Sequence, residues 1–415
     1  MAVQEPARRP ILWGAAAWLL LWAIVAGMVL RNLASPTDAV GLRYDYADFR
    51  DTTWTPLQDF LRGQLPWETA DYQLRHPNAQ PFLLYVPHYF ALGFLLLMLP
   101  YPAAVGLWIG LTTASVAMLV TASMWRWLPG VARRAPWVVL PLSCFFALTP
   151  PGKYGLFTGN WVTVCAPAAA ALVLVRRPWS VAGALFLSVV KPQVGVPASL
   201  MALGWGRWKG VLMAAGASLL LVLPVMGVAV RRAGGVGPFI DMLGRNLQAA
   251  DQELSSNALP QVDTAHLLGQ LGAPGPLVLA GGLVVALAVG LLGLWAGRRA
   301  PGSAGQALGL GLFVLLALPN LLYTALVLVP AIAGLVAEVG AGLRDRGSDG
   351  RWRAPVVLRL LLLGLLLFPF VNFYRLFPLL GYSVAVGYLV NAICLNLAAL
   401  VAPLTLRLRC GEAER

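Results

Sequence analysis

Long apolar runs, separated by short polar or basic turns, make up most of the chain. The first run, Ile11 to Leu30, is long enough to cross a bilayer as a helix. It follows Arg8 and Arg9 and is longer than the core of a secretory signal, so we interpret it as an uncleaved first helix with a cytoplasmic N-terminus. Further apolar segments follow at approximately 81–99, 102–125, 136–150, 160–175, 179–205, 209–230, 273–297, 303–319, 321–341, 355–374 and 378–405.

Segment 179–205 is inconsistent with a single crossing of the membrane. One crossing would place Arg177 and Arg207 on opposite sides, against the tendency of basic residues to stay in the cytoplasm. Proline breaks a helix in its interior. We therefore expect two half-helices that meet at Lys191 and Pro192.

The region 81–150 has a similar problem, because Arg126, Arg133 and Arg134 do not fit a simple alternation of spans. Either one segment dips into the membrane without crossing it, or these arginines are exceptions. The pattern as a whole predicts an all-α, polytopic integral membrane protein with about 10 to 13 spans. We expect residues 1–415 to form a single membrane domain.

Two polar stretches interrupt this pattern, at residues 31–80 and 231–274, and together they hold eleven of the 17 acidic residues. The orientation of the first helix places 31–80 outside the cytoplasm, where its tyrosines and tryptophans suit interfacial helices. We expect a long first external loop at 31–80, which is the proposed catalytic region, and a second external loop at 231–274. Proton-coupled transporters usually carry ionisable groups within the bilayer, and the apolar segments here are nearly free of carboxylates.

Composition excludes several classes of protein. With 59% apolar and 11% charged residues and a mean hydropathy of +0.74, the chain is neither a soluble enzyme nor a disordered protein. The net charge of +13 fits the bias of cytoplasmic loops, and no nucleic-acid partner is expected. The four cysteines show no metal-ligand spacing, so no cofactor is expected, although a divalent metal held by aspartates of the first loop stays open.

The strongest candidate chemistry lies shortly after the first helix, where Asp45, Asp48 and Asp51 are spaced by three residues. This spacing puts them on one face if the stretch is helical. A partly desolvated carboxylate at the interface can act as a general base on a sugar hydroxyl, and like charges so close raise the pKa of at least one. The alternative is a solvated polar loop in which one aspartate caps an interfacial helix.

Lys191 is the second candidate, because it lies well inside an apolar stretch. A cation there needs a partner or an aqueous cavity, and an anionic lipid phosphate would be such a partner. Snorkelling of the side chain to the surface is the alternative. Asn160 and Asn257 are further candidates to line the same cavity.

Tyr85 and His88 stand at the outer start of an apolar segment. An imidazole there can donate a hydrogen bond to a phosphate or a sugar hydroxyl. The alternative is a pair of residues in the aromatic belt of the membrane interface.

The order and spacing of several motifs carry a resemblance to a known family. The motifs are Asp48-Phe49, Gly63-x-x-Pro66-Trp67, Tyr85-x-Pro87, Gly159-Asn160, Arg176-Arg177, Ala182-Gly183 and Lys191-Pro192. Together they resemble the bacterial polyprenol-phosphate-dependent glycosyltransferases of the GT-C type, and among these glycosyltransferase family eighty-seven. The resemblance is best over about residues 11–230.

The resemblance implies an inverting transfer of a sugar, with a mannose-like hexose favoured, from a polyprenyl-phosphate donor to a lipid or glycan acceptor. It implies an active site on the outer face of the bacterial plasma membrane. Asp48 would be the base toward the acceptor hydroxyl, with Asp45 and Asp51 as rivals. Lys191 matches the position where binding of the donor phosphate is implied.

This chain departs from the family pattern in a late segment. Many members carry Ser-Pro followed by Trp and histidines there, whereas residues 318–323 read Leu-Pro-Asn-Leu-Leu-Tyr. Two other functions therefore stay open: a transporter or flippase of a lipid-linked sugar, and a catalytically inactive family member.

Overall fold

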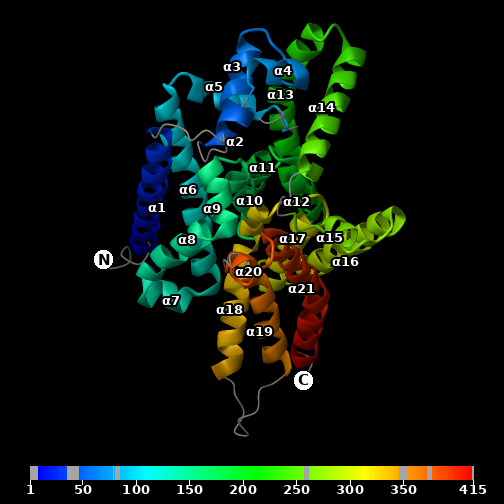
Figure 1. Cartoon of the computed structure of the whole chain (residues 1–415). Coiled ribbons are helices and arrows are strands. Elements are labelled where there is room, and N and C mark those ends of the chain that lie inside the picture. Colours follow the sequence, from blue (N-terminus) through cyan, green and yellow to red (C-terminus); the bar gives the residue numbers. More distant parts are fainter. Residues whose placement is uncertain are drawn as a thin grey trace.

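The computed structural model describes residues 8–34, 46–77, 79, 85–256, 261–344, 354–371 and 376–413. Every regular element in these ranges is helical, and one isolated backbone bridge joins Gln261 to Leu321. The predicted all-α, polytopic architecture is confirmed (Figure 1). The elements are α1 (Arg8–Ala34), α2 (Ala47–Phe49), η1 (Arg50–Trp54), α3 (Thr55–Leu61), α4 (Thr69–Arg75), α5 (Tyr89–Leu97), α6 (Tyr101–Trp127), α7 (Pro129–Arg134), η2 (Pro136–Val138), α8 (Val139–Leu148), α9 (Pro150–Thr158), α10 (Val162–Ala171), α11 (Pro178–Ser188), α12 (Pro192–Gly204), α13 (Trp208–Arg232), α14 (Val236–Ser256), α15 (Thr264–Gln270), α16 (Gly275–Arg299), α17 (Ala304–Leu316), η3 (Leu322–Leu328), α18 (Val329–Arg344), α19 (Ala354–Leu367), η4 (Phe368–Phe370), α20 (Leu376–Leu379) and α21 (Val384–Ala413).

Six helices of the described chain are long and apolar enough to cross a membrane alone: Ile11–Arg31, Tyr101–Trp127, Trp208–Arg232, Gly275–Arg299, Leu322–Arg344 and Val384–Thr405. Five shorter apolar helices lie among them: Pro136–Leu148, Val162–Ala171, Pro178–Ser188, Ala304–Leu316 and Ala354–Phe370. The chain is therefore a multi-pass membrane protein by the length and composition of its helices. The count of about 10 to 13 spans stays a prediction, because it depends on how the shorter helices sit in the bilayer.

The first two long helices run antiparallel. The indole N–H of Trp18 donates to the backbone oxygen of Gly110 (2.9 Å), and that of Trp22 donates to the oxygen of Gly106 (3.1 Å). From the first pair to the second, the residue number rises along α1 and falls along α6. The C-terminal end of α6 therefore lies at the same end of the bundle as the start of α1.

Basic side chains gather at that end, which we call the basic end. The guanidinium groups of Arg126 and Arg176 donate to the backbone oxygens of Gly302 and Pro301, at 3.2 and 3.0 Å. The opposite end, which we call the loop end, carries α2, α3 and α4 (Figure 1). Both contacts join turns that are distant in sequence, so three separate parts of the chain meet at the basic end.

The short helix α5 bears on the region 81–150, where three arginines do not fit a simple alternation of spans. This helix has only nine residues and packs on α3 and η1 at the loop end. Pro87 lies just before it, and Pro100 precedes α6, so the apolar segment 81–99 does not form one long helix. A helix of this length fits the alternative in which one segment does not cross, and the placement of Arg126 relative to the membrane stays a prediction.

The break predicted in segment 179–205 is confirmed. Lys191 has extended backbone between α11 and α12, and Pro192 begins α12. The start of α13, which follows closely after α12, packs against the start of α11, because a Cβ atom placed on Gly210 would be 3.1 Å from the backbone oxygen of Pro178. The last residue of α12, Gly204, accepts a hydrogen bond from Arg298 at the end of α16 (2.9 Å). The pair therefore starts and ends at the basic end, with Lys191 at its apex.

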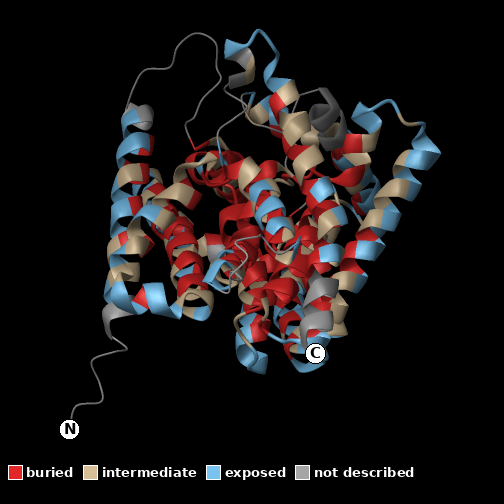
Figure 2. Cartoon of the chain, turned by 90° about the horizontal axis from the view of Figure 1, so that it is seen from below, coloured by how far each residue is buried: buried red, intermediate tan, exposed pale blue. Residues whose placement is uncertain are grey.

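The interior is packed with apolar side chains, and many outer faces of the helices are apolar as well. Figure 2 shows the buried residues gathered at the centre, with exposed residues on the outer helix faces. Leucines such as Leu220 on α13 and Leu279 on α16 are largely exposed in the isolated chain. Exposed leucines along such long helices are typical of surfaces that face lipid.

Candidate functional site

The segment that carries Asp48 is held by side chains from later helices. Tyr89 donates its hydroxyl hydrogen to the backbone oxygen of Thr52 (2.6 Å), and the indole of Trp161 donates to the hydroxyl of Thr53 (2.8 Å). The backbone here continues from α2 through the π-helical turn η1, a local geometry found often at functional sites. The first loop is therefore anchored on the helical bundle at this point.

Asp48 itself is buried and oriented by an amide. The Nδ2 group of Asn160 donates to Oδ2 of Asp48 at 2.9 Å, while Oδ1 of Asn160 accepts from the backbone N–H of Val162 at 2.9 Å. Burial raises the pKa of Asp48, although hydrogen bonds from Thr158 and Asn160 and the nearby charge of Lys191 act in the opposite direction. The carboxylate is thus fixed in direction and is a stronger proton acceptor than one in solvent.

Gly159 lets the Asn160 segment approach the loop. Its φ of +75° is left-handed, and an added Cβ atom would lie 2.7 Å from Cβ of Phe49 and 2.8 Å from the ring of Tyr46. Its backbone oxygen accepts a hydrogen bond from the indole of Trp108 (2.9 Å). A side chain at this position would force the segment away from Asp48.

Replacing Gly159 with alanine is expected to lower the melting temperature of the purified protein and to reduce its activity. The left-handed backbone costs an L-residue about 1–2 kcal/mol, and the clash with Phe49 and Tyr46 adds to that cost. Gly63→Ala is the matched control, because Gly63 also has positive φ (+93°) but no atom within 4 Å of its added Cβ. Equal losses in both variants would show that the approach to Asp48 does not depend on Gly159.

Lys191 projects from the apex of the α11–α12 pair. Its Nζ donates to the hydroxyl of Tyr323 at 3.0 Å and lies 4.4 Å from the centre of that ring. The charges of Lys191 and Asp48 are close enough to act on each other. A backbone hydrogen bond from Val86 to Val190 (3.1 Å) joins this apex to the segment that follows the first loop.

Tyr85 lies in the same region. The side chain is buried, and its hydroxyl lies near the side chain of Asn160 but makes no well-formed hydrogen bond within the described part of the chain. It lies within electrostatic reach of Asp48 and Tyr323. A buried hydroxyl without a partner is costly, and a bound polar ligand would satisfy it.

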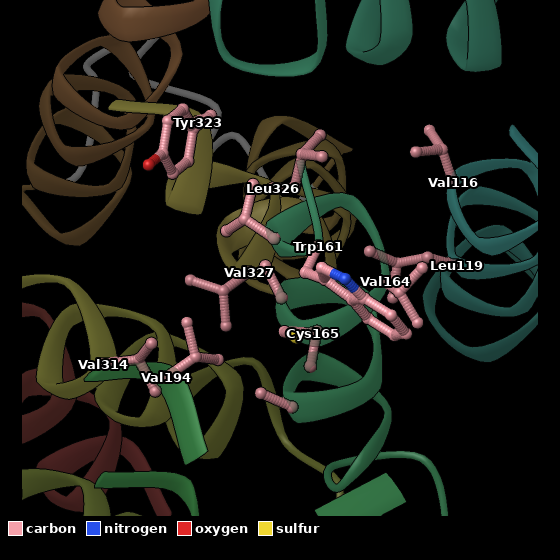
Figure 3. Packing of buried hydrophobic residues seen from close by; sticks show 14 of the residues in the cluster. Val116, Leu119, Trp161, Val164, Cys165, Val194, Val314, Tyr323, Leu326 and Val327 are labelled. Carbon is pink, nitrogen blue, oxygen red and sulfur yellow. The ribbon is translucent and has the colours of Figure 1, made fainter. Parts of the chain in front are cut away.

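These side chains form one polar cluster from five separate parts of the chain. We call it the Asp48–Lys191 cluster; its members are Asp48, Tyr85, Asn160, Lys191 and Tyr323. Figure 3 shows Tyr323 above the apolar packing that surrounds Trp161, Cys165 and Val194. The arrangement provides a carboxylate, an amide, two hydroxyls and an ammonium within an apolar surrounding.

The other predicted acids are placed differently. Asp51 is buried in an ion pair with Arg50, with a distance of 2.6 Å between Nε and Oδ1. This pairing neutralises its charge. Asp45 lies outside the described residues, and so does Asn257, which was predicted to line the cavity at Lys191.

His88 is buried and faces α11. One of its ring nitrogens, Nε2, lies 2.9 Å from the backbone oxygen of Phe186, and the two rings are 4.7 Å apart. This contact anchors the segment before α5 to the bundle. This ring nitrogen is therefore engaged within the protein. The expected role of His88 toward a phosphate stays a prediction.

Sequence reasoning gave no role to Tyr323 or Thr158. Tyr323 stands at the end of the stretch in which this chain departs from the family pattern, and that departure is the signal that could have identified it. Thr158 precedes the Gly159-Asn160 motif and acts on Asp48 through its hydroxyl. Among the described residues, no three His, Cys, Asp or Glu side chains are grouped to hold a metal ion.

Comparison with known families gives one match. The model of glycosyltransferase family 87 matches residues 82–319, more than half of the chain. The matched range includes Tyr85, Asn160 and Lys191, and it begins after Asp48. Searches of curated proteins and of solved structures found no significant match.

Proposed function

Because the chain belongs to glycosyltransferase family 87, we propose that it transfers a sugar from a polyprenyl-phosphate donor to a lipid or glycan acceptor. Family membership and the long apolar helices make it a membrane glycosyltransferase. A mannose-like hexose is the favoured sugar, following the resemblance of the sequence. The observation that supports the proposal best is the Asp48–Lys191 cluster, which combines a base with a cation.

The proposed reaction is a direct displacement at the anomeric carbon. Asp48 accepts the proton of the acceptor hydroxyl as that oxygen forms its bond to the anomeric carbon. The bond from this carbon to the phosphate oxygen breaks, and the electron pair leaves with the polyprenyl phosphate. Attack opposite to the leaving group inverts the anomeric configuration.

Three further members of the cluster have a proposed part in this step. Asn160 holds one oxygen of Asp48, so the other oxygen is the one to take the proton. Lys191 binds the donor phosphate and stabilises the negative charge that develops on it. Tyr85 hydrogen-bonds a hydroxyl of the sugar or acceptor, which would satisfy its own buried hydroxyl.

The two ends of the bundle are proposed to face opposite sides of the membrane. We place the basic end in the cytoplasm of a bacterial plasma membrane and the loop end outside, because basic residues favour the cytoplasmic side. The N-terminus is then cytoplasmic, and the Asp48–Lys191 cluster faces outward. The polyprenyl tail stays in the bilayer while the phosphate and sugar reach the cluster from the outer leaflet.

The test is formation of a new glycosidic bond by the purified protein in proteoliposomes. The donor is a labelled synthetic polyprenyl-phosphate mannose, and lipid-linked and glycan acceptors are offered in turn. The expected result is a labelled product with inverted anomeric configuration. Movement of labelled donor across the bilayer without a new bond would instead identify a flippase, and neither activity would identify an inactive member.

The rate of transfer is expected to fall on the acid side of neutrality. The base works only when ionised, so activity is lost as the pH falls through the pKa of Asp48. Burial raises that pKa, so the loss is expected at a higher pH than the range of an ordinary aspartate, which is about pH 4. The measurement is kcat/KM against pH, and a rate that stays constant down to about pH 4 would contradict the assignment.

A further inference from the structure

The contact between Lys191 and Tyr323 is unusual for a buried lysine. Only 7% of Lys191 and 4% of Tyr323 is exposed. Within the described part of the chain, the hydroxyl of Tyr323 is the one hydrogen-bond partner of the ammonium, at 3.0 Å. A buried ammonium normally requires a close carboxylate or several acceptors.

A neutral partner leaves the lysine able to bind an anion. The ammonium has three N–H donors, and the tyrosine accepts one of them. Tyr323 is neutral, and the charge of Asp48 acts on Lys191 without an ion pair between them, so the positive charge is only partly offset. The ring of Tyr323, 4.4 Å from Nζ, adds a cation–π attraction that keeps the ammonium over its face.

Tyr323 is itself held from two sides. Its ring stacks on that of Tyr154, with centroids 5.6 Å apart and an angle of 25°. The adjacent Thr324 donates to the side chain of Asn320 (3.1 Å), whose own amide donates to the backbone oxygen of Val314 (2.7 Å). The tyrosine thus has a fixed position that does not depend on α11 or α12.

We propose that Tyr323 is a positioning residue for Lys191, whose hydroxyl and ring hold the ammonium at the apex of the α11–α12 pair, ready for the donor phosphate. This inference rests on the proposed function. The alternative is a core tyrosine that acts only by packing. In that case the ring matters and the hydroxyl does not, so the two readings differ in what loss of the hydroxyl does.

The test is Tyr323→Phe, which removes the hydroxyl and keeps the ring and its stacking. The expected result is an increase of about tenfold in the KM for donor and in the Kd for sugar-free polyprenyl phosphate, as for loss of one hydrogen bond to a charged group. The kcat, the KM for acceptor and the melting temperature are expected to change little. Tyr154→Phe is the matched control: that residue is 40% exposed, contacts the same ring and is expected to keep wild-type donor binding.

Two further variants separate the possible failures. Tyr323→His also keeps an aromatic ring but supplies an acceptor nitrogen in place of the lost hydroxyl, and it is expected to recover part of the donor binding. If Lys191→Met loses donor binding while Tyr323→Phe binds as the wild type does, the positioning role is wrong and the proposed donor site stands. If Lys191→Met itself binds donor normally, the proposed donor site fails, and the positioning role fails with it.

Discussion

Replacing Asp48 with asparagine is expected to reduce sugar transfer by about 10²- to 10⁴-fold, the usual contribution of a general base. Asparagine is nearly isosteric, and its side-chain oxygen can still accept the hydrogen bond from Asn160, so the first loop is expected to keep its place. The amide cannot take a proton from the acceptor. The loss should therefore appear in kcat, with the melting temperature and the KM for donor close to wild type.

The matched control for this variant is Asp71→Asn. Asp71 belongs to the same polar stretch, 31–80, but is exposed on α4, so its replacement should leave transfer unchanged. Wild-type turnover by the Asp48→Asn variant would overturn the assignment. Asp45, which lies in the same motif, would then be the first carboxylate to test.

Replacing Lys191 with methionine is expected to raise the KM for donor and to lower kcat/KM by about 10²-fold or more. A charge-assisted hydrogen bond to phosphate contributes about 1.5–3 kcal/mol, and Lys191 would also stabilise the leaving phosphate in the transition state. Methionine keeps the length and apolar stem of the side chain, and burying it is less costly than burying an ammonium. The variant should therefore fold at least as well as the wild type.

Lys209→Met is the matched control for the loss of a lysine. Lys209 is exposed at the start of α13, near the basic end and away from the Asp48–Lys191 cluster. It is expected to bind donor normally. If both variants lose donor binding equally, the effect comes from total charge rather than from a phosphate site at the apex.

Local patterns in the sequence were sufficient to predict the first helix and the helix break that carries Lys191. The apolar run after Arg9 predicts the first helix, and Pro192 together with the basic residues at both ends of 179–205 predicts the break at Lys191. These features depend on the length of apolar runs and on backbone chemistry, which act over a few residues. The same patterns did not give the bounds of the helix in segment 81–99, where α5 ends at Leu97 and α6 begins only at Tyr101.

The contacts within the cluster could not be predicted in this way. Asp48 and Asn160 are 112 residues apart, and Lys191 and Tyr323 are 132 residues apart. No periodicity connects residues at such separations, because their meeting depends on how the helices pack. Tyr323 in particular reads as an ordinary apolar-segment tyrosine until the structure places Lys191 over its ring.

The sequence left Asp51 open as an alternative base, and its ion pair with Arg50 argues against that role. Three aspartates at equal spacing offer three possible bases. In the structure Asp51 has both oxygens within 3.0 Å of its neighbouring guanidinium. An aspartate in such an ion pair is a poorer base than Asp48, which accepts hydrogen bonds from neutral side chains and has Lys191 only at longer range.

The central claim is that one cluster contains two separate functions, a base at Asp48 and a phosphate-binding cation at Lys191. The most direct measurement is the Kd for a sugar-free polyprenyl phosphate, determined for the wild type, Asp48→Asn and Lys191→Met in the same membrane mimetic. We expect near-normal binding by Asp48→Asn, which no longer transfers sugar, and weakened binding by Lys191→Met. Normal binding by Lys191→Met, or loss of binding by Asp48→Asn alone, would contradict it.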